Sequence, residues 1–240
     1  MAPAHTSAPP ATPETLPRRS FLYRQLSAAG AVFSVCGDAA VAARFPGVDE
    51  AARTARLGFA DLSPLPRWGV KGPAAPHWLA EQGVVVPAAA NLASAGPTGG
   101  LVARLSAHEH LLLWPGDGGE AALGRLDAAA GAGERGLYVL PRRDSHAWLC
   151  LVGTAVPACL AKLCAVDLRP AAFADLAVAQ TQLARISVVL IRQDRPGGPA
   201  WHLLWDSASA AFLWQALSAA AAEFDGGPIG LEALEAVGGM

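Results

Sequence analysis

The sequence predicts an α+β fold with mainly antiparallel sheets and packed helices, arranged as two pseudo-symmetric halves. Three observations lead to this prediction. A nine-residue segment occurs twice, short apolar runs alternate with helix-like runs, and turns rich in Gly and Pro join neighbouring apolar runs. The chain has 240 residues, 52% of them apolar, and is therefore long enough to bury a sizeable core.

The repeated segment is GPAAPHWLA at 72–80 and GTAVPACLA at 153–161. The copies agree in their Gly, Pro, Leu and final Ala, each displaced by 81 positions (153 minus 72). Each copy follows a short apolar run, RWGV or WLCLV, so its Gly is expected where a strand turns into a helix. Pro76 and Pro157 then fall in the first helical turn, where a missing N–H costs little because these donors have no intrahelical partner.

Further units of a strand followed by a helix are predicted along the chain. HLLLW (110–114) precedes GEAALGRLDAAA (119–130), and AWHLLWD (200–206) precedes SASAAFLWQALSAAAAEF (207–224), with Ser207 or Ser209 as the expected N-cap. Residues 178–192 are rich in β-branched and apolar side chains and predict one long strand. RQDRPGGP (192–199) then predicts a hairpin turn.

The ends of the chain differ from this body in composition. Residues 1–20 are rich in Pro, Ala and Thr and have no apolar core of a secretory signal, so a disordered arm is expected. Residues 21–50 contain the alternating VFSV and a Pro-Gly turn, which predict a short strand outside the body that serves for attachment. The body is expected at 51–224, with interlocked halves at 51–135 and 136–224, and 225–240 is expected to be a tail.

Charge and apolar patterning narrow the classes of partner. The chain has 18 Lys plus Arg against 20 Asp plus Glu, so no long-range field favours nucleic acid or an acidic membrane. No apolar run approaches the ~20 residues that a membrane helix needs. We therefore expect a cytoplasmic protein that binds neither nucleic acid nor membrane.

The cysteines and histidines give weak signals for metal binding. Cys36, Cys150, Cys159 and Cys164 have no C-x-x-C spacing and lie in apolar runs, which indicates small buried side chains rather than disulfides or zinc ligands. His108 and His110 flank Glu109 and would share a face of a strand, as in a metal site, but a polar turn before LLLWP is the favoured interpretation. GDGG at 116–119 lacks the spacing of a phosphate-binding loop and is interpreted as a turn.

The stretch RRDSHAW (142–148) contains the residue types of a hydrolase triad. However, adjacent residues point apart on a strand or a helix, and no Gly-x-Ser-x-Gly elbow is present. We therefore interpret Asp144, Ser145 and His146 as a polar strand entry before a buried Trp148. Asp61 and Ser63 of ADLSPLPRW are expected at a comparable entry in the first half, as turn and cap residues.

Four segments together resemble the gamma subunit of heterotetrameric sarcosine oxidase over roughly residues 20–224. They are LGFADLSPLPRWGVKGP (57–73), LPRRDSHAWLCLVG (140–153), AKLCAVDLRPAAFA (161–174) and VAQTQLARISVVLIR (178–192). The resemblance implies a complex with alpha, beta and delta subunits that oxidises sarcosine to glycine. It also implies FAD, FMN and NAD on the larger subunits and transfer of the one-carbon unit to tetrahydrofolate, with no cofactor on this chain. The family-signature or interface candidates are Asp61, Arg67, Lys71, Gly72, Arg142, Asp144, His146 and Trp148.

That family is in turn similar in fold to the folate-binding part of aminomethyltransferase, the glycine-cleavage T-protein. In that family Gly-Gly-x-x-Asp-Asp supplies an acid next to the folate amine, whereas GGLVAR here places Ala103 and Arg104 at those positions. An Arg guanidinium stays protonated and cannot act as a base. The family's Thr-Gly-Tyr-Thr-Gly-Glu corresponds to QTQLAR, in which Thr181 is kept and both glycines and the Glu are absent. No catalytic residue is therefore expected on this chain.

Two functions follow from these resemblances. The first is a non-catalytic subunit that stabilises the flavin-bearing subunits, with Arg142 and Arg143 reaching acidic groups on a partner and with some of the seven Trp residues at an interface rather than in the core. A complex that oxidises N-methylglutamate is a variant of it. The second is a folate-binding one-carbon transferase, which would need an acid from elsewhere, such as Glu109 or Asp117.

Overall fold

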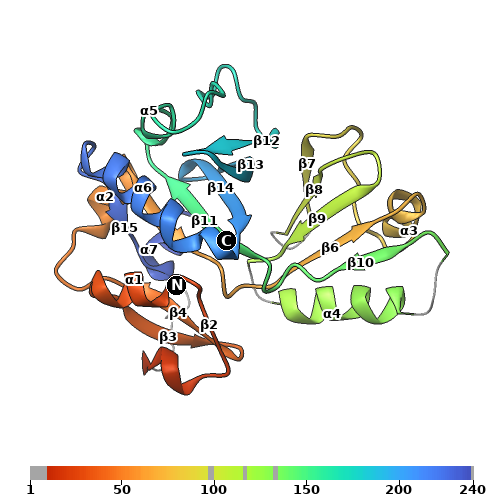
Figure 1. The fold of residues 1–240 in the computed structure, drawn as a ribbon, viewed down its shortest axis with the longest axis horizontal. Coiled ribbons are helices and arrows are strands. Elements are labelled where there is room, and N and C mark those ends of the chain that lie inside the picture. The colour runs from red at the N-terminus through yellow and green to blue at the C-terminus, as the bar shows by residue number, and fades with distance from the viewer. Residues whose placement is uncertain (1–9, 97–99, 116–117, 132–134, 239–240) are drawn as a thin grey trace, which may run out of the picture.

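The structure is a computed structural model that describes residues 10–96, 100–115, 118–131 and 135–238. Two sheets face each other with helices on their outer sides, and a smaller sheet from the N-terminal part packs beside them (Figure 1). The strands are β1 Pro10–Ala11, β2 Arg18–Arg19, β3 Val32–Cys36, β4 Ala39–Arg44, β5 Gly58–Asp61, β6 Arg67–Lys71, β7 Leu92–Ala95, β8 Leu101–Arg104, β9 Glu109–Leu113, β10 Tyr138–Leu140, β11 His146–Val152, β12 Val178–Leu183, β13 Ile186–Arg195, β14 Gly198–Asp206 and β15 Gly227–Pro228. The helices are η1 Pro13–Thr15, α1 Tyr23–Ala28, α2 Glu50–Arg56, α3 Ala75–Glu81, α4 Gly119–Ala130, α5 Val156–Leu160, η2 Ser207–Ser209, α6 Ala210–Ala222 and α7 Leu231–Ala236.

The two halves of the body exchange a strand. The five-stranded sheet has the order β10-β6-β9-β8-β7, and the six-stranded sheet has the order β12-β13-β14-β11-β5-β15. β10 leaves the second half to pair with β6, and β5 leaves the first half to pair with β11. Most strand pairs are antiparallel, which confirms the predicted fold class. Separating the halves would break both exchanged ladders.

The core consists of three apolar layers. One lies between the six-stranded sheet and its helices α5 and α6, the second lies between the two sheets, and the third lies between the five-stranded sheet and α3 and α4 (Figure 1). The four cysteines form no disulfide, and three of them are buried. Six of the seven tryptophans are also buried, so core packing accounts for them; they are Trp68, Trp78, Trp148, Trp201, Trp205 and Trp214.

The repeated segments make the same turn from strand to helix. Gly72 has φ +124° and Gly153 has φ +110°, a region that side chains disfavour. A Cβ on Gly72 would lie 2.0 Å from the carbonyl oxygen of Gly136, and one on Gly153 would lie 2.5 Å from that of Arg56. Both glycines are therefore required by conformation and by the close approach of another segment.

Residues 178–192 form two strands, so the prediction of one long strand is wrong. β12 and β13 are joined by Ala184 and Arg185, whose φ values of +48° and +70° fit a two-residue hairpin turn. Neither residue is the Gly or Asn that such turns favour, so the sequence carries no local signal for this turn. The hairpin expected at 192–199 is confirmed, because β13 ends at Arg195 and β14 begins at Gly198.

The N-terminal part is more ordered than expected. Residues 28–47 form two strands, β3 and β4, in a four-stranded sheet with β1 and β2, and residues 10–19 hold β1, η1 and β2 in place of a disordered arm. Residues 1–9 lie outside the described part. Leu22, Phe33 and Phe45 are buried in the layer beneath α5 and α6, so the expected attachment segment covers the body of its own chain.

The C-terminal residues belong to the fold as well. β15 pairs with β5, and Ile229 and Leu234 are buried.

The cap before α6 also differs from the prediction: the carboxylate of Asp206 accepts from the N–H of Ala208 at 2.8 Å, because a turn of 3-10 helix precedes α6. Neither Ser207 nor Ser209 makes the expected cap bond. None of the helices in the described part has the length and apolar content that a bilayer crossing requires.

Candidate functional site

Arg67 holds the point where the two halves cross. Arg67 is the first residue of β6 and is 4% exposed. Its side chain donates hydrogen bonds from all three guanidinium nitrogens. The acceptors are the carbonyl oxygens of Ser63 at 2.6 Å, Leu65 at 3.4 Å, Arg142 at 2.8 Å, Arg143 at 2.5 Å, and His146. Burial lowers the pKa of Arg67 to about 10, so it stays charged at neutral pH. One cation thus fixes the segment between β10 and β11.

Asp61, Ser63 and Trp148 form a second connection at the crossing. The Ser63 hydroxyl donates to Asp61 Oδ1 at 2.6 Å and accepts from the backbone N–H of Trp148 at 3.0 Å, and the Ser63 N–H also donates to Asp61. Burial raises the pKa of Asp61, although the bonds from Ser63 oppose that rise. These side chains satisfy backbone donors at a turn, as expected from the sequence.

Ser145 and His146 lie in contact, contrary to the expectation that neighbours point apart. The Ser145 hydroxyl is 2.7 Å from Nδ1 of His146. The carboxylate of Asp144, however, is exposed and lies 3.8 Å from the guanidinium of Arg18, so it is not the orienting acid of a triad. Burial, together with the charges of Arg142 and Arg67, lowers the pKa of His146 to about 4, so the ring is neutral at pH 7.

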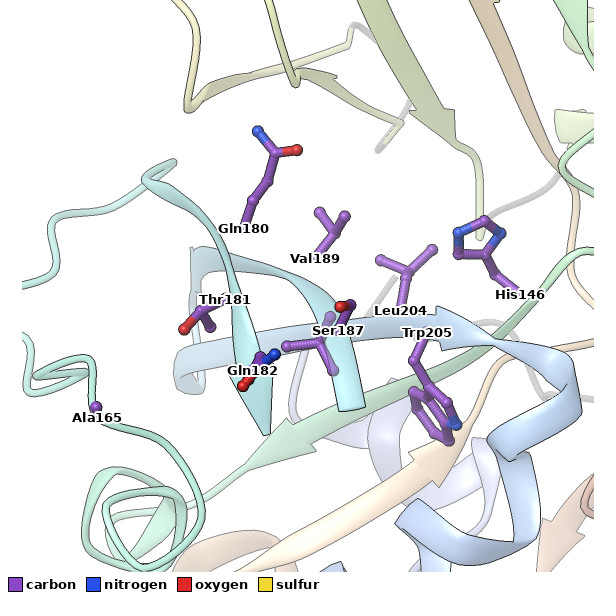
Figure 2. A pocket seen from close by; sticks show the side chains of 10 residues that line it. His146, Ala165, Gln180, Thr181, Gln182, Ser187, Val189, Leu204 and Trp205 are labelled. Atoms are coloured by element: carbon purple, nitrogen blue, oxygen red, sulfur yellow. The ribbon is translucent and has the colours of Figure 1, made fainter. Parts of the chain in front are cut away.

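A pocket of about 640 Å³ opens beside His146, at the end of the six-stranded sheet. Figure 2 shows the side chains of His146, Gln180, Val189 and Leu204 directed into the same space. The volume is within the range of about 300–1,000 Å³ that is typical of small-molecule sites. No carboxylate and no Lys or Arg is among its lining residues, which are His146, Ala165, Gln180, Thr181, Gln182, Ser187, Val188, Val189, Leu204 and Trp205.

Ala103 and Arg104, which stand where aminomethyltransferase has its acidic residues, have other roles here. Ala103 on β8 is fully buried in the layer between the sheets, and Arg104 donates to the carbonyls of Pro87 and Ala88, both at 3.0 Å. Glu109 is paired with Arg142. Asp117 and Gly99 lie outside the described residues. The part of the pocket that the structure describes therefore does not supply the acid that folate chemistry would need.

The remaining candidates lie apart from the pocket. Lys71 is exposed at the end of β6, and Gly72 makes the turn into α3. Arg142 and Arg143 pair with Glu109 and Glu120 of their own chain, and the expectation that they reach acidic groups on a partner stays a prediction.

The two histidines beside Glu109 do not form a pair. His110 is buried in β9, and neither of its ring nitrogens has a hydrogen-bond partner among the described residues, whereas His108 is exposed before the strand begins. Burial lowers the pKa of His110 to about 4. No cluster of three metal-ligating side chains occurs in the described ranges. Of GDGG, Gly116 and Asp117 lie outside these ranges, and Gly118 precedes α4 as its N-cap.

Most of the pocket was missed by sequence reasoning. Gln182, Ser187 and Val189 come together because β12 and β13 form a hairpin, whereas the sequence indicated a single strand there. Leu204 and Trp205 on β14 were expected only as strand residues. The two polar residues around Thr181 in QTQLAR were the one available signal.

The comparisons with known proteins agree with this architecture. The GCVT N-terminal domain family matches residues 98–237. The crystal structure of glycine cleavage system aminomethyltransferase T from Bartonella henselae matches with TM-score 0.70 and 18% identity over 92% of this chain, which spans 61% of that protein. A chain of heterotetrameric sarcosine oxidase from Corynebacterium sp. U-96, solved with pyrrole 2-carboxylate, matches with TM-score 0.65 and 24% identity. That match covers 88% of this chain and 97% of the other.

No curated protein matches the chain by sequence. The two structural matches show the fold and confirm the predicted likeness to aminomethyltransferase. The family match covers more than half of the residues. This chain therefore belongs to the family of the GCVT N-terminal domain.

Proposed function

We propose that this chain is the gamma-type subunit of a sarcosine oxidase-type complex and has no catalytic residue of its own. In this role it stabilises the flavin-bearing subunits, with alpha, beta and delta subunits as partners in the cytoplasm. One observation carries the proposal. At the position where the family has its acid, Ala103 is packed in the core and Arg104 is tied to backbone carbonyls.

The lengths of the related chains support the same role. The fold extends over 97% of a chain of heterotetrameric sarcosine oxidase but over 61% of an aminomethyltransferase. In the proposed complex, sarcosine is demethylated to glycine and the one-carbon unit passes to tetrahydrofolate. FAD, FMN and NAD belong to the larger subunits. This chain contributes surface for assembly rather than a cofactor site.

The pocket favours a second candidate, a folate-binding one-carbon transferase. It has a suitable volume, and it lies on the sheet that carries the segment corresponding to the family's folate contacts. Its lining is neutral, however, and a carboxylate is what would favour the charged form of the folate amine. We therefore place this candidate second.

Co-expression with alpha, beta and delta subunits separates the two candidates. The proposal predicts stoichiometric incorporation by size-exclusion chromatography with mass measurement, and no heat of tetrahydrofolate binding to the isolated chain. Folate binding that Val189→Phe abolishes, without complex formation, would establish the transferase alternative, because Val189 faces the pocket (Figure 2). Turnover of sarcosine and of N-methylglutamate by the assembled complex then identifies the amine substrate.

A further inference from the structure

The outer edge of β12 has main-chain groups that face away from its sheet. Among the described residues, β12 pairs only with β13. Leu183 opposite Ile186 closes the two-residue turn, so this pair exchanges hydrogen bonds. Hydrogen-bonded and non-hydrogen-bonded pairs then alternate along the ladder, so the main-chain N–H and C=O groups of Thr181 and Ala179 point toward β13. The N–H and C=O groups of Gln180 and Gln182 therefore point outward.

Two bonds mark the limits of this open edge. The outward N–H of Val178 donates to the carbonyl oxygen of Asn91 at 3.0 Å, and the N–H of Ala184 donates to that of Leu163 at 2.9 Å. Between them, no main-chain bond to the outer groups of Gln180 or Gln182 occurs in the described part of the chain. Both residues are exposed. The free stretch has room for about two residues of an added strand, because each strand residue advances roughly 3.3 Å.

This edge lacks the features that usually prevent pairing with another chain. Exposed edge strands are commonly blocked by Lys, Pro, a bulge or an inward charge. The sequence VAQTQL has none of these, and its register with β13 is regular over all six residues. Such an edge is suited to β-augmentation by an extended segment, in which the main chain supplies the bonds.

The adjacent pocket is uncharged, which restricts the kind of side chain that an added segment could place in it. Gln180, Thr181 and Gln182 line both the edge and the pocket, so a side chain of an added strand would lie beside these uncharged residues, whereas His146 lies on β11, three strands away from β12. None of the described residues that line the pocket could pair with a charge. A charged side chain would lose its hydration without compensation, whereas an uncharged polar or apolar one would fit.

We propose that the edge of β12 at Gln180 and Gln182 receives an extended segment of a partner subunit, uncharged where it faces the pocket, which adds a short strand to the six-stranded sheet. This inference rests on the proposed function, since it assigns the place where the subunit attaches to its complex.

Substitution of Gln182 tests the role of the main chain. Gln182→Pro removes an outward N–H and adds a ring at the edge, while the bonds to β13 remain because Gln182 donates none of them. The matched control, Gln182→Ala, removes the side chain and keeps the N–H. Each variant is co-expressed with the alpha, beta and delta subunits, and its affinity for them is measured after its melting temperature is shown to equal that of the unaltered chain.

We expect Gln182→Pro to weaken assembly by about tenfold or more relative to Gln182→Ala, from the loss of one hydrogen bond and a steric conflict with the added strand. In the unaltered complex, hydrogen exchange at the amides of Gln180 and Gln182 should slow relative to the isolated chain. Equal assembly of both variants, with unchanged exchange, overturns the inference and leaves the proposed function intact.

Two other outcomes are decisive. Slow exchange at these amides in the isolated chain, or its dimerisation in sedimentation that Gln182→Pro abolishes, would show that the edge is already occupied and would overturn the inference. Failure of the unaltered chain to assemble with any of the three subunits overturns the proposed function, and the inference with it.

Discussion

Replacement of Arg67 should separate the two halves of the fold more readily than any other single polar substitution at their crossing. Its guanidinium makes five hydrogen bonds to backbone carbonyls of two segments, and its side chain is 4% exposed. Arg67→Met keeps a similar apolar length but leaves those carbonyls without their donor. Most of the lost hydrogen bonds are those to the segment that connects β10 with β11.

The expected loss of unfolding free energy in Arg67→Met is the balance of two opposing contributions. Hydrogen bonds to a charged donor contribute about 1.5–3 kcal/mol each, but burying the guanidinium costs several kcal/mol. Removing one member of a buried charged network typically destabilises a protein by about 3–5 kcal/mol. We expect Arg67→Met to lose that amount, a large share of the roughly 5–15 kcal/mol that stabilises most domains.

Urea unfolding followed by tryptophan fluorescence measures this loss, because six tryptophans are buried in the fold. Arg67→Lys should give an intermediate stability, since one ammonium reaches fewer carbonyls than a planar guanidinium. Arg169→Met is the control, because Arg169 is exposed and pairs only with its near neighbour Asp167 among the described residues, so no measurable change is expected. An Arg67→Met variant within about 1 kcal/mol of the unaltered chain would refute the reasoning.

Three further predictions concern glycine turns and a buried histidine. Gly72→Ala and Gly153→Ala should each lower the unfolding free energy by about 2 kcal/mol or more, because the new Cβ meets backbone atoms at positive φ. Gly124→Ala, in an open position of α4, should instead raise it by about 0.5–1 kcal/mol, and equal effects at all three sites would contradict this account. His110→Leu should stabilise the chain by about 1 kcal/mol at pH 7, because neither ring nitrogen has a partner in the part of the chain that the structure describes. The pKa of His110 falls from 6.5 to about 4 on folding, so the unfolded state binds the extra proton in this window and stability falls as pH is lowered. That fall should be smaller in His110→Leu than in the unaltered chain, as measured by urea midpoints; a parallel fall in both proteins would disprove it.

The sequence by itself determined the features that depend on local backbone chemistry. The two copies of the turn at Gly72 and Gly153 follow from a strand, a Gly and a Pro in the first helical turn, and the structure shows both. The hairpin after Arg195 follows from Pro and Gly at adjacent positions. The turn contacts of Asp61 and Ser63 also use bonds within a few residues, which the sequence makes visible.

Only the tertiary structure decided which segment covers which. The turn at Ala184 and Arg185 has residues with no preference for positive φ, so the pairing of β12 with β13 imposes it. The apolar side chains of the N-terminal sheet suit a partner or the chain's own body equally well in sequence. Arg67 at the start of a strand is usually solvated, and it is buried here because a segment 75 residues away supplies its acceptors. Burial depends on distant segments, and for that reason the crossing and the pocket were not visible in the sequence.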